Sequence, residues 1–154
     1  MVVHIYGLPV DMEPIVKMVK KNKIFLIEDA AEQIGQTYKK KPIGSFGDIS
    51  TFSFYANKHV TTGEGGMIAT NSKKLVEKFA ILRNISFQPK KQKFIHDELG
   101  WNYRITDLQA ALGLSQLKRL NKFIKKRRQL AIVYDEELSE LSINIPWQSP
   151  ETHS

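Results

Sequence analysis

Lys58 lies at a position where the sequence predicts a reactive side chain. Lys58 follows residues 49–54, which alternate apolar and hydroxyl side chains and have the β-branched and aromatic content of a strand. A glycine-rich turn at residues 63–66 closes the segment. We therefore predict Lys58 just beyond the carboxyl end of a strand, the edge of an open α/β sheet where ligands bind. A lysine held there among apolar groups can serve as a Schiff-base nucleophile.

A carboxylate is predicted at the same edge. Residues 23–32 contain a continuous apolar run, typical of a parallel strand buried on both faces, and the run leads to Asp29. The segment that follows is long enough for a parallel crossover, which needs roughly a dozen residues. A lysine and a carboxylate at adjacent strand ends suit pyridoxal phosphate, because the lysine can bind its aldehyde and the carboxylate can keep its pyridine nitrogen protonated.

Each of these features also has an ordinary explanation. Lys58 could be a surface lysine in a turn, and Asp29 could be a helix N-cap. The glycines at 63–66 could suggest a nucleotide phosphate loop, but they lack the Gly-Lys-Ser/Thr ending of a P-loop and the strand-to-helix setting of a dinucleotide fingerprint. We assign them to the backbone geometry around Lys58, and the pairing of Lys58 with Asp29 favours the cofactor interpretation.

Four sequence blocks stand out by their order and spacing: residues 27–32, 44–48, the Lys58 turn at 53–66, and 99–104 with 109–111. Together they resemble the signature of the DegT/DnrJ/EryC1/StrS family of sugar aminotransferases. The resemblance implies an α/β fold: part of the large domain of a type I, aspartate aminotransferase-like enzyme, with a mostly parallel sheet and flanking helices. A long helix would then lead into an incomplete small domain, so we expect residues 1–112 in the large domain and 113–154 in the linker helix and small domain.

The resemblance also implies roles for individual residues at a pyridoxal 5'-phosphate site. Lys58 would carry the cofactor and move protons, Asp29 would pair with its pyridine nitrogen, and Ser53 would donate to its phosphate. Asn102 would reach the phosphate in the partner subunit of a homodimer. Glu32 would stand beside the phenolic oxygen, where an ionised carboxylate is repelled, so a shared proton or an indirect role through substrate is favoured.

Plain structural alternatives stay open for several of these residues. Ser53 could be an ordinary strand serine, and Glu32 an exposed glutamate at a helix start. The resemblance suggests His59 and Arg104 as substrate contacts, His59 through protons or sugar and Arg104 through anionic groups that suit its planar fork. Arg104 could equally pair with Asp107.

The reaction implied by the resemblance is transamination of a nucleotide-linked keto sugar, such as a 4-keto-6-deoxyhexose, with L-glutamate as amino donor, in polysaccharide or O-antigen biosynthesis. Members of the family are much longer than this chain, so the chain is expected to be an internal or truncated fragment with weak cofactor binding. The alternative is a non-catalytic homologue that pairs with a full-length aminotransferase.

Amino-acid composition and charge bear on disulfides, metal sites, membrane spans and nucleic-acid binding. The 154 residues contain no cysteine, which excludes disulfides and thiolate metal sites and fits a cytoplasmic location. We expect no membrane span, no signal peptide and no metal site. The net charge of +7 gathers at 17–23, 90–93 and 118–128. The last group alternates with apolar residues at helical spacing, which favours a solvated helix face over nucleic-acid or phospholipid binding.

The remaining elements follow from periodicity and turn residues. We predict strands at 2–6 and 66–70, the second antiparallel, and a short hairpin within 35–47. We predict helices at 12–21, with Asp11 as N-cap, and at 73–83, capped by Asn71 or Ser72. Residues 84–99 are expected to form a loop, 106–141 a long or kinked helix with Gly113 as its weak point, and 146–150 the approach to a further strand.

Overall fold

Four strands form one sheet in the order β1-β2-β5-β6 in this computed structural model, which describes residues 1–88 and 94–144. They are β1 (Val2–Val3), β2 (Ile27–Asp29), β5 (Ile49–Ser53) and β6 (Gly66–Ala69). The first three are parallel and β6 is antiparallel to β5. The predicted α/β class and the antiparallel return strand are confirmed.

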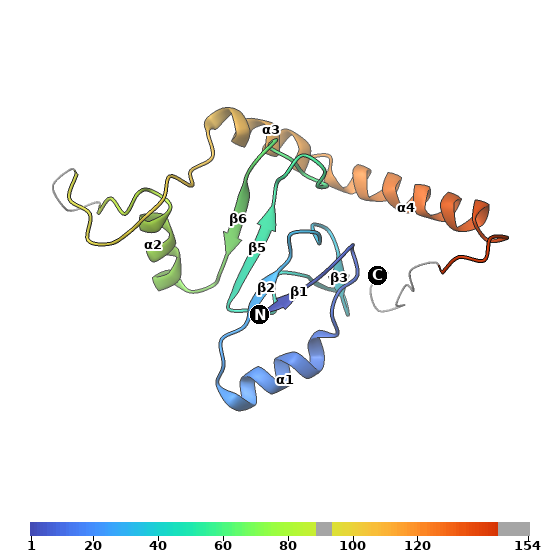
Figure 1. The fold of residues 1–154 in the computed structure, drawn as a ribbon, viewed down its shortest axis with the longest axis horizontal. Coiled ribbons are helices and arrows are strands. Elements are labelled where there is room, and N and C mark those ends of the chain that lie inside the picture. The colour runs from blue at the N-terminus through green and yellow to red at the C-terminus, as the bar shows by residue number, and fades with distance from the viewer. Residues whose placement is uncertain (89–93, 145–154) are drawn as a thin grey trace.

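A separate hairpin and four helices complete the described fold (Figure 1). The hairpin pairs β3 (Thr37–Tyr38) with β4 (Lys41–Pro42), inside the segment where it was predicted. The helices are α1 (Met12–Asn22), α2 (Lys73–Leu82), α3 (Asp107–Leu117) and α4 (Leu120–Glu137).

Helix α1 begins and ends at residues with clear local reasons. The Asp11 side chain caps it by accepting a hydrogen bond from the N–H of Glu13, as predicted. Pro14 lies in the first turn, where its missing N–H costs nothing. The helix ends at Asn22, and the next residue, Lys23, is its C-cap with a left-handed φ of 53°. The predicted strand start at Lys23 is therefore wrong, because this residue caps the helix and β2 begins only at Ile27.

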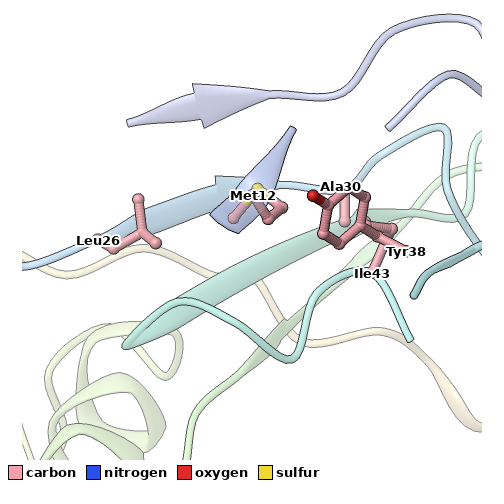
Figure 2. Packing of buried hydrophobic residues seen from close by; sticks show 5 residues of the cluster. All are labelled: Met12, Leu26, Ala30, Tyr38 and Ile43. Atoms are coloured by element: carbon pink, nitrogen blue, oxygen red, sulfur yellow. The ribbon is translucent and has the colours of Figure 1, made fainter. Parts of the chain in front are cut away.

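The core lies between α1, β2 and the hairpin. Figure 2 shows its five buried members together: Met12, Leu26, Ala30, Tyr38 and Ile43. The Tyr38 hydroxyl also donates a hydrogen bond to the Asp11 carboxylate, which joins the hairpin to the start of α1. Apolar burial and this polar contact together fix α1 against the sheet.

Only one face of β2 is buried. Leu26, Glu28 and Ala30 are each at most 3% exposed, whereas Ile27 is 36% exposed. This alternation has the period of a strand with one covered face. The predicted burial on both faces is wrong for the described structure, because the side chains of Val3, Ile27 and Ile68 remain exposed on the opposite face of the sheet.

A buried carboxylate occupies the centre of the covered face. Glu28 is 0% exposed and accepts hydrogen bonds from the backbone N–H groups of Gly44, Phe46 and Gly47. His4 places Nε2 3.4 Å from Glu28 Oε2 while its Nδ1 accepts the N–H of Val10. The proton of a neutral His4 is therefore on Nε2, facing Glu28. The carboxylate joins β1, β2 and the loop that precedes β5.

Burial alone would raise the pKa of Glu28, because it disfavours the charged form. The contact with His4 and the N–H donors of Gly47, Gly44 and Phe46 act in the opposite direction and outweigh burial. The pKa of Glu28 therefore lies below its ordinary value, and the side chain is ionised at neutral pH.

The long helix is interrupted later than predicted. Helix α3 ends at Leu117 and α4 begins at Leu120, so the break lies at Lys118 and Arg119 rather than at Gly113. The Arg119 side chain donates to the carbonyl of Ser115 at the break. Figure 1 shows α4 extending away from the sheet, on the side opposite α2.

The start of α2 and the basic face of α4 can be compared with their predictions, whereas two other predictions fall outside the described residues. Ser72 caps α2 by accepting a hydrogen bond from the N–H of Leu75, as expected. The basic residues of 118–128 are exposed and Leu120, Phe123 and Ile124 are half-buried. However, Leu117, Leu130 and Val133 are exposed as well, so the predicted packed face of this helix is formed only in part. The basic residues at 90–93 and the strand approach at 146–150 lie outside the described residues.

We predict that Glu28→Ala strongly destabilises the fold. Removal of the carboxylate leaves the N–H groups of Gly44, Phe46 and Gly47 buried and unpaired. The free energy of unfolding should fall by about 3–5 kcal/mol, because each donor left without an acceptor costs about 1–3 kcal/mol. Urea denaturation measures this change. Glu13→Ala, which removes an exposed ion-pair partner of Lys17 and Lys39, should leave stability nearly unchanged.

The lowered pKa of Glu28 also predicts acid sensitivity. Its stabilising effect is complete above the unfolded-state pKa of about 4.3 and is lost as pH falls through the lower folded-state value. In urea denaturation between pH 7 and pH 3, the parent protein should therefore lose more stability on acidification than Glu28→Gln. Parallel pH profiles would contradict the assignment of this charge.

Candidate functional site

The predicted site residues gather at the carboxyl ends of two neighbouring parallel strands. β2 ends at Asp29 and β5 ends at Ser53. In the register of the pair Asp29 lies opposite Thr51, so Asp29 and Ser53 are on the same face of the sheet. The turn that carries Lys58 follows directly. The structure thus places these three residues at one sheet edge, as predicted.

The Lys58 turn is held by its own hydrogen bonds. Phe54 anchors both arms: its N–H donates to the carbonyl of Gly65 and its carbonyl accepts the N–H of Thr62, each at 2.9 Å. Gly65 has a φ of 144°, and a side chain there would approach the Thr62 hydroxyl to 2.7 Å. Val60 is buried and Lys58 is half-buried. The glycines therefore serve the turn geometry, as the sequence suggested.

Helix α3 supports this turn from outside. The side-chain oxygen of Gln116 accepts the N–H of Thr61 at 3.1 Å, and the side-chain amide of Gln109 donates to the carbonyl of Glu64 at 3.1 Å. Gly113 lies between them, where a Cβ would come within 2.9 Å of the Thr62 methyl carbon. Gly113 thus permits close packing of helix and turn. Gln116 was missed, since no local pattern marks a contact this distant in sequence.

Lys58 pairs with Glu32 in this structure. Lys58 Nζ lies 3.2 Å from Glu32 Oε1, and the N–H of Tyr6 donates to Glu32 Oε2 at 2.7 Å. The Tyr6 hydrogen bond, followed by the hydrogen bond to Lys58, lowers the pKa of Glu32 below its ordinary value. Glu32 is thus an ionised neighbour of Lys58, and the alternative of an exposed helix-start glutamate is wrong, because Glu32 is half-buried and lies in a turn.

Asp29 and Ser53 make short-range contacts within their own segments. Asp29 Oδ1 accepts the N–H of Ala31 at 3.1 Å in a turn, and the next element is β3 and not a helix, so the helix N-cap alternative is wrong. Ser53 Oγ accepts the N–H of Tyr55 at 3.2 Å. Both contacts orient the side chains without excluding a ligand, because a carboxylate has a second oxygen and a hydroxyl can still donate its proton.

His59 lies beside Lys58 and is half-buried. Burial lowers its pKa first, and the nearby positive charges of Arg127 and Lys58 lower it further. His59 is therefore neutral at pH 7, the form that can accept a proton.

Asn102 and Arg104 lie on the segment before α3. Arg104 Nε donates to Asn102 Oδ1 at 3.5 Å. The backbone beside them is fixed by the N–H of Trp101, which donates to the carbonyl of Leu82. Asn102 is exposed and its described contacts do not include Lys58, so a role for Asn102 in this chain's own site is not supported by the geometry.

An apolar cavity of about 610 Å³ lies behind the Lys58 turn. Its lining includes Phe52, Val60 and Leu114, and neither Lys58 nor Asp29 belongs to it. The candidate site is therefore the open strand edge and not this cavity.

Two other kinds of site find no support in the described ranges, 1–88 and 94–144. There, no three histidine, aspartate or glutamate side chains gather in a way that could bind a metal ion. Within the same ranges no helix has the length and apolar character needed to cross a membrane.

Comparison with solved structures defines the class of the fold. The Helicobacter pylori aminotransferase PseC, involved in the biosynthesis of pseudoaminic acid, superimposes with a TM-score of 0.84 at 35% identity. This match covers 91% of this chain and 38% of the PseC chain. S. venezuelae DesV, solved in complex with a ketimine intermediate, superimposes with a TM-score of 0.86 at 33% identity. This match covers 97% of this chain and 40% of the DesV chain. The fold is part of a type I aminotransferase.

The family follows from the sequence. The DegT/DnrJ/EryC1/StrS aminotransferase family model matches residues 1–154, and the chain belongs to this family. A similar curated relative is the GDP-perosamine synthase of Escherichia coli O157:H7, which is 46% identical over 141 residues, 92% of this chain and 38% of the relative. The chain thus spans less than half the length of this relative.

The residues at the strand edge fit pyridoxal phosphate by their chemistry. Lys58 provides an amine, Asp29 a carboxylate and Ser53 a hydroxyl, all at one edge of adjacent parallel strands. These are the groups that an aldehyde, a pyridine nitrogen and a phosphate require.

The environment of His59 predicts a measurable titration. In NMR spectra His59 should titrate below the ordinary histidine pKa of about 6.5. Arg127→Gln should raise this pKa, because it removes a positive charge that disfavours the protonated ring. Arg128→Gln is the matched control and should leave it unchanged. Equal effects of both variants would contradict the assignment to Arg127.

Proposed function

We propose that this chain carries the cofactor-binding strand edge of a pyridoxal-phosphate-dependent sugar aminotransferase. The observation that supports this most directly is the placement of Lys58, Asp29 and Ser53 at the carboxyl ends of β2 and β5. Membership of the family supports the same reaction class.

When bound, pyridoxal phosphate supplies an aldehyde that reacts with amines and a ring that withdraws electrons from the carbon beside the nitrogen. Lys58 would hold the cofactor covalently and, once released, carry a proton at Nζ as general base. The Asp29 carboxylate would keep the pyridine nitrogen protonated, and the Ser53 hydroxyl would donate to the phosphate.

Other residues would prepare the site rather than react. The hydrogen bonds from Gln109 and Gln116 hold the two arms of the Lys58 turn. The neutral ring of His59 can exchange a proton beside Lys58. The Asp29–Ala31 contact fixes the carboxylate that faces the strand edge.

For the substrate we propose a nucleotide-linked keto sugar, with L-glutamate as amino donor. The name of the relative from Escherichia coli, GDP-perosamine synthase, supports a nucleotide-linked sugar. His59 and Arg104 are the proposed substrate contacts, and a homodimer with Asn102 reaching the partner's site remains part of the proposal. The two relatives whose names are a synthase and an aminotransferase, from Escherichia coli and Helicobacter pylori, favour catalysis over a non-catalytic pairing partner.

Borohydride trapping tests the covalent role of Lys58. Protein incubated with pyridoxal phosphate and then reduced should carry the cofactor on Lys58, as mapped by peptide mass spectrometry. Lys58→Ala should remove this label. Lys78→Ala, which changes an exposed lysine paired with Glu98, should retain it.

The result that would contradict the proposal is cofactor spread over exposed lysines with no preference for Lys58. A longer relative mixed with this chain provides the test of the pairing alternative. A change in that relative's aminotransferase activity, without cofactor on Lys58, would favour pairing over catalysis.

A further inference from the structure

We propose that Glu32 is a positioning residue that holds the ε-ammonium group of Lys58 whenever this lysine is not bound to cofactor. The inference rests on the proposed function, because it concerns the state of Lys58 before the cofactor binds and after it leaves. It assigns Glu32 to the lysine itself rather than to the phenolic oxygen of the cofactor.

The Glu32 carboxylate uses its two oxygens for two different partners. Oε2 accepts the N–H of Tyr6 at 2.7 Å, and Oε1 lies 3.2 Å from Lys58 Nζ. The first contact orients the carboxylate, and the second places an ammonium group at its remaining oxygen. This arrangement joins the segments that follow β1, β2 and β5.

The turn that presents the Tyr6 N–H is itself well defined. Tyr6 and Gly7 have left-handed φ values of 51° and 78°, and the N–H of Leu8 donates to the carbonyl of Ile5 at 2.9 Å. The Gln36 side chain donates to the carbonyl of Gly7 at 2.9 Å. Glu32 is therefore held by a fixed backbone donor and not by a mobile side chain.

Burial distinguishes this ion pair from the surface pairs of the chain. The Lys58 side chain is 18% exposed, whereas that of Lys78 in its pair with Glu98 is 48% exposed, and the two carboxylates are each 34% exposed, so the difference lies on the lysine side. A less exposed pair is less screened by water and contributes more than a surface pair.

The pairing has a direct chemical consequence. The hydrogen bond to Glu32 fixes the direction of Lys58 Nζ and limits the approach of an electrophile to it. Glu32 would thus keep the cofactor-free lysine in place and slow to react with stray electrophiles. Replacement of Glu32 by a neutral isostere should make Lys58 more reactive.

Competitive labelling with trinitrobenzenesulfonate at pH 8 tests this, with the full chain free of cofactor and each lysine quantified by mass spectrometry. Glu32→Gln should increase the labelling rate of Lys58 about three- to tenfold, as expected for loss of a partly shielded ion pair. Glu32→Asp should restore part of the protection, which separates charge from side-chain volume. Lys78 is the internal reference, and Glu64→Gln, in the same turn as Lys58, is the matched control.

Equal labelling of Lys58 in the parent protein and in Glu32→Gln would overturn the inference. So would an increase of the same size at Lys78, because that would indicate general loosening of the fold. Borohydride trapping with pyridoxal phosphate on the same variants separates this inference from the proposed function. Faster labelling of Lys58 in Glu32→Gln, without cofactor attachment at Lys58, supports the ion pair and overturns the proposed cofactor role.

Discussion

The buried carboxylate of Glu28 is the interaction on which the rest of this fold depends. It lies on the covered face of β2 and accepts hydrogen bonds from three backbone N–H groups of the loop before β5, which would otherwise lack an acceptor. A side chain on Gly47 would approach the Leu26 carbonyl to 2.8 Å, so the loop can surround the carboxylate only with glycine there. Through His4 the same carboxylate contacts the strand next to it.

This arrangement has consequences on the opposite face of the sheet. Glu28 and Asp29 are consecutive in β2, so one faces the core and the other faces the open side. Fixing Glu28 against the loop before β5 therefore also fixes Asp29 relative to Thr51, and hence relative to Ser53 and the Lys58 turn. Structural and proposed chemical roles alternate along one short strand.

Local patterns predicted what depends on local physics. Strand periodicity placed Lys58, Asp29 and Ser53 at one edge, and capping residues located the starts of α1 and α2. Contacts between distant segments were not predictable in this way. The buried acid is Glu28, in the middle of β2, and not a residue at a strand end. Gln116 accepts a hydrogen bond from a turn that is distant in sequence. Glu32 is oriented toward Lys58 by its hydrogen bond with the N–H of Tyr6. Gly113 was predicted to be a weak point of the helix, whereas the structure shows that it permits the close approach of α3 to Thr62.

The central claim is that β2 and β5 present one set of groups to one cofactor. A crystal structure of the protein grown with pyridoxal phosphate tests it most directly. We predict electron density continuous with Lys58 Nζ, the Asp29 carboxylate within hydrogen-bond distance of the pyridine nitrogen, and the Ser53 hydroxyl at the phosphate. Cofactor bound elsewhere, or a ring whose nitrogen has no contact with Asp29, would contradict the account.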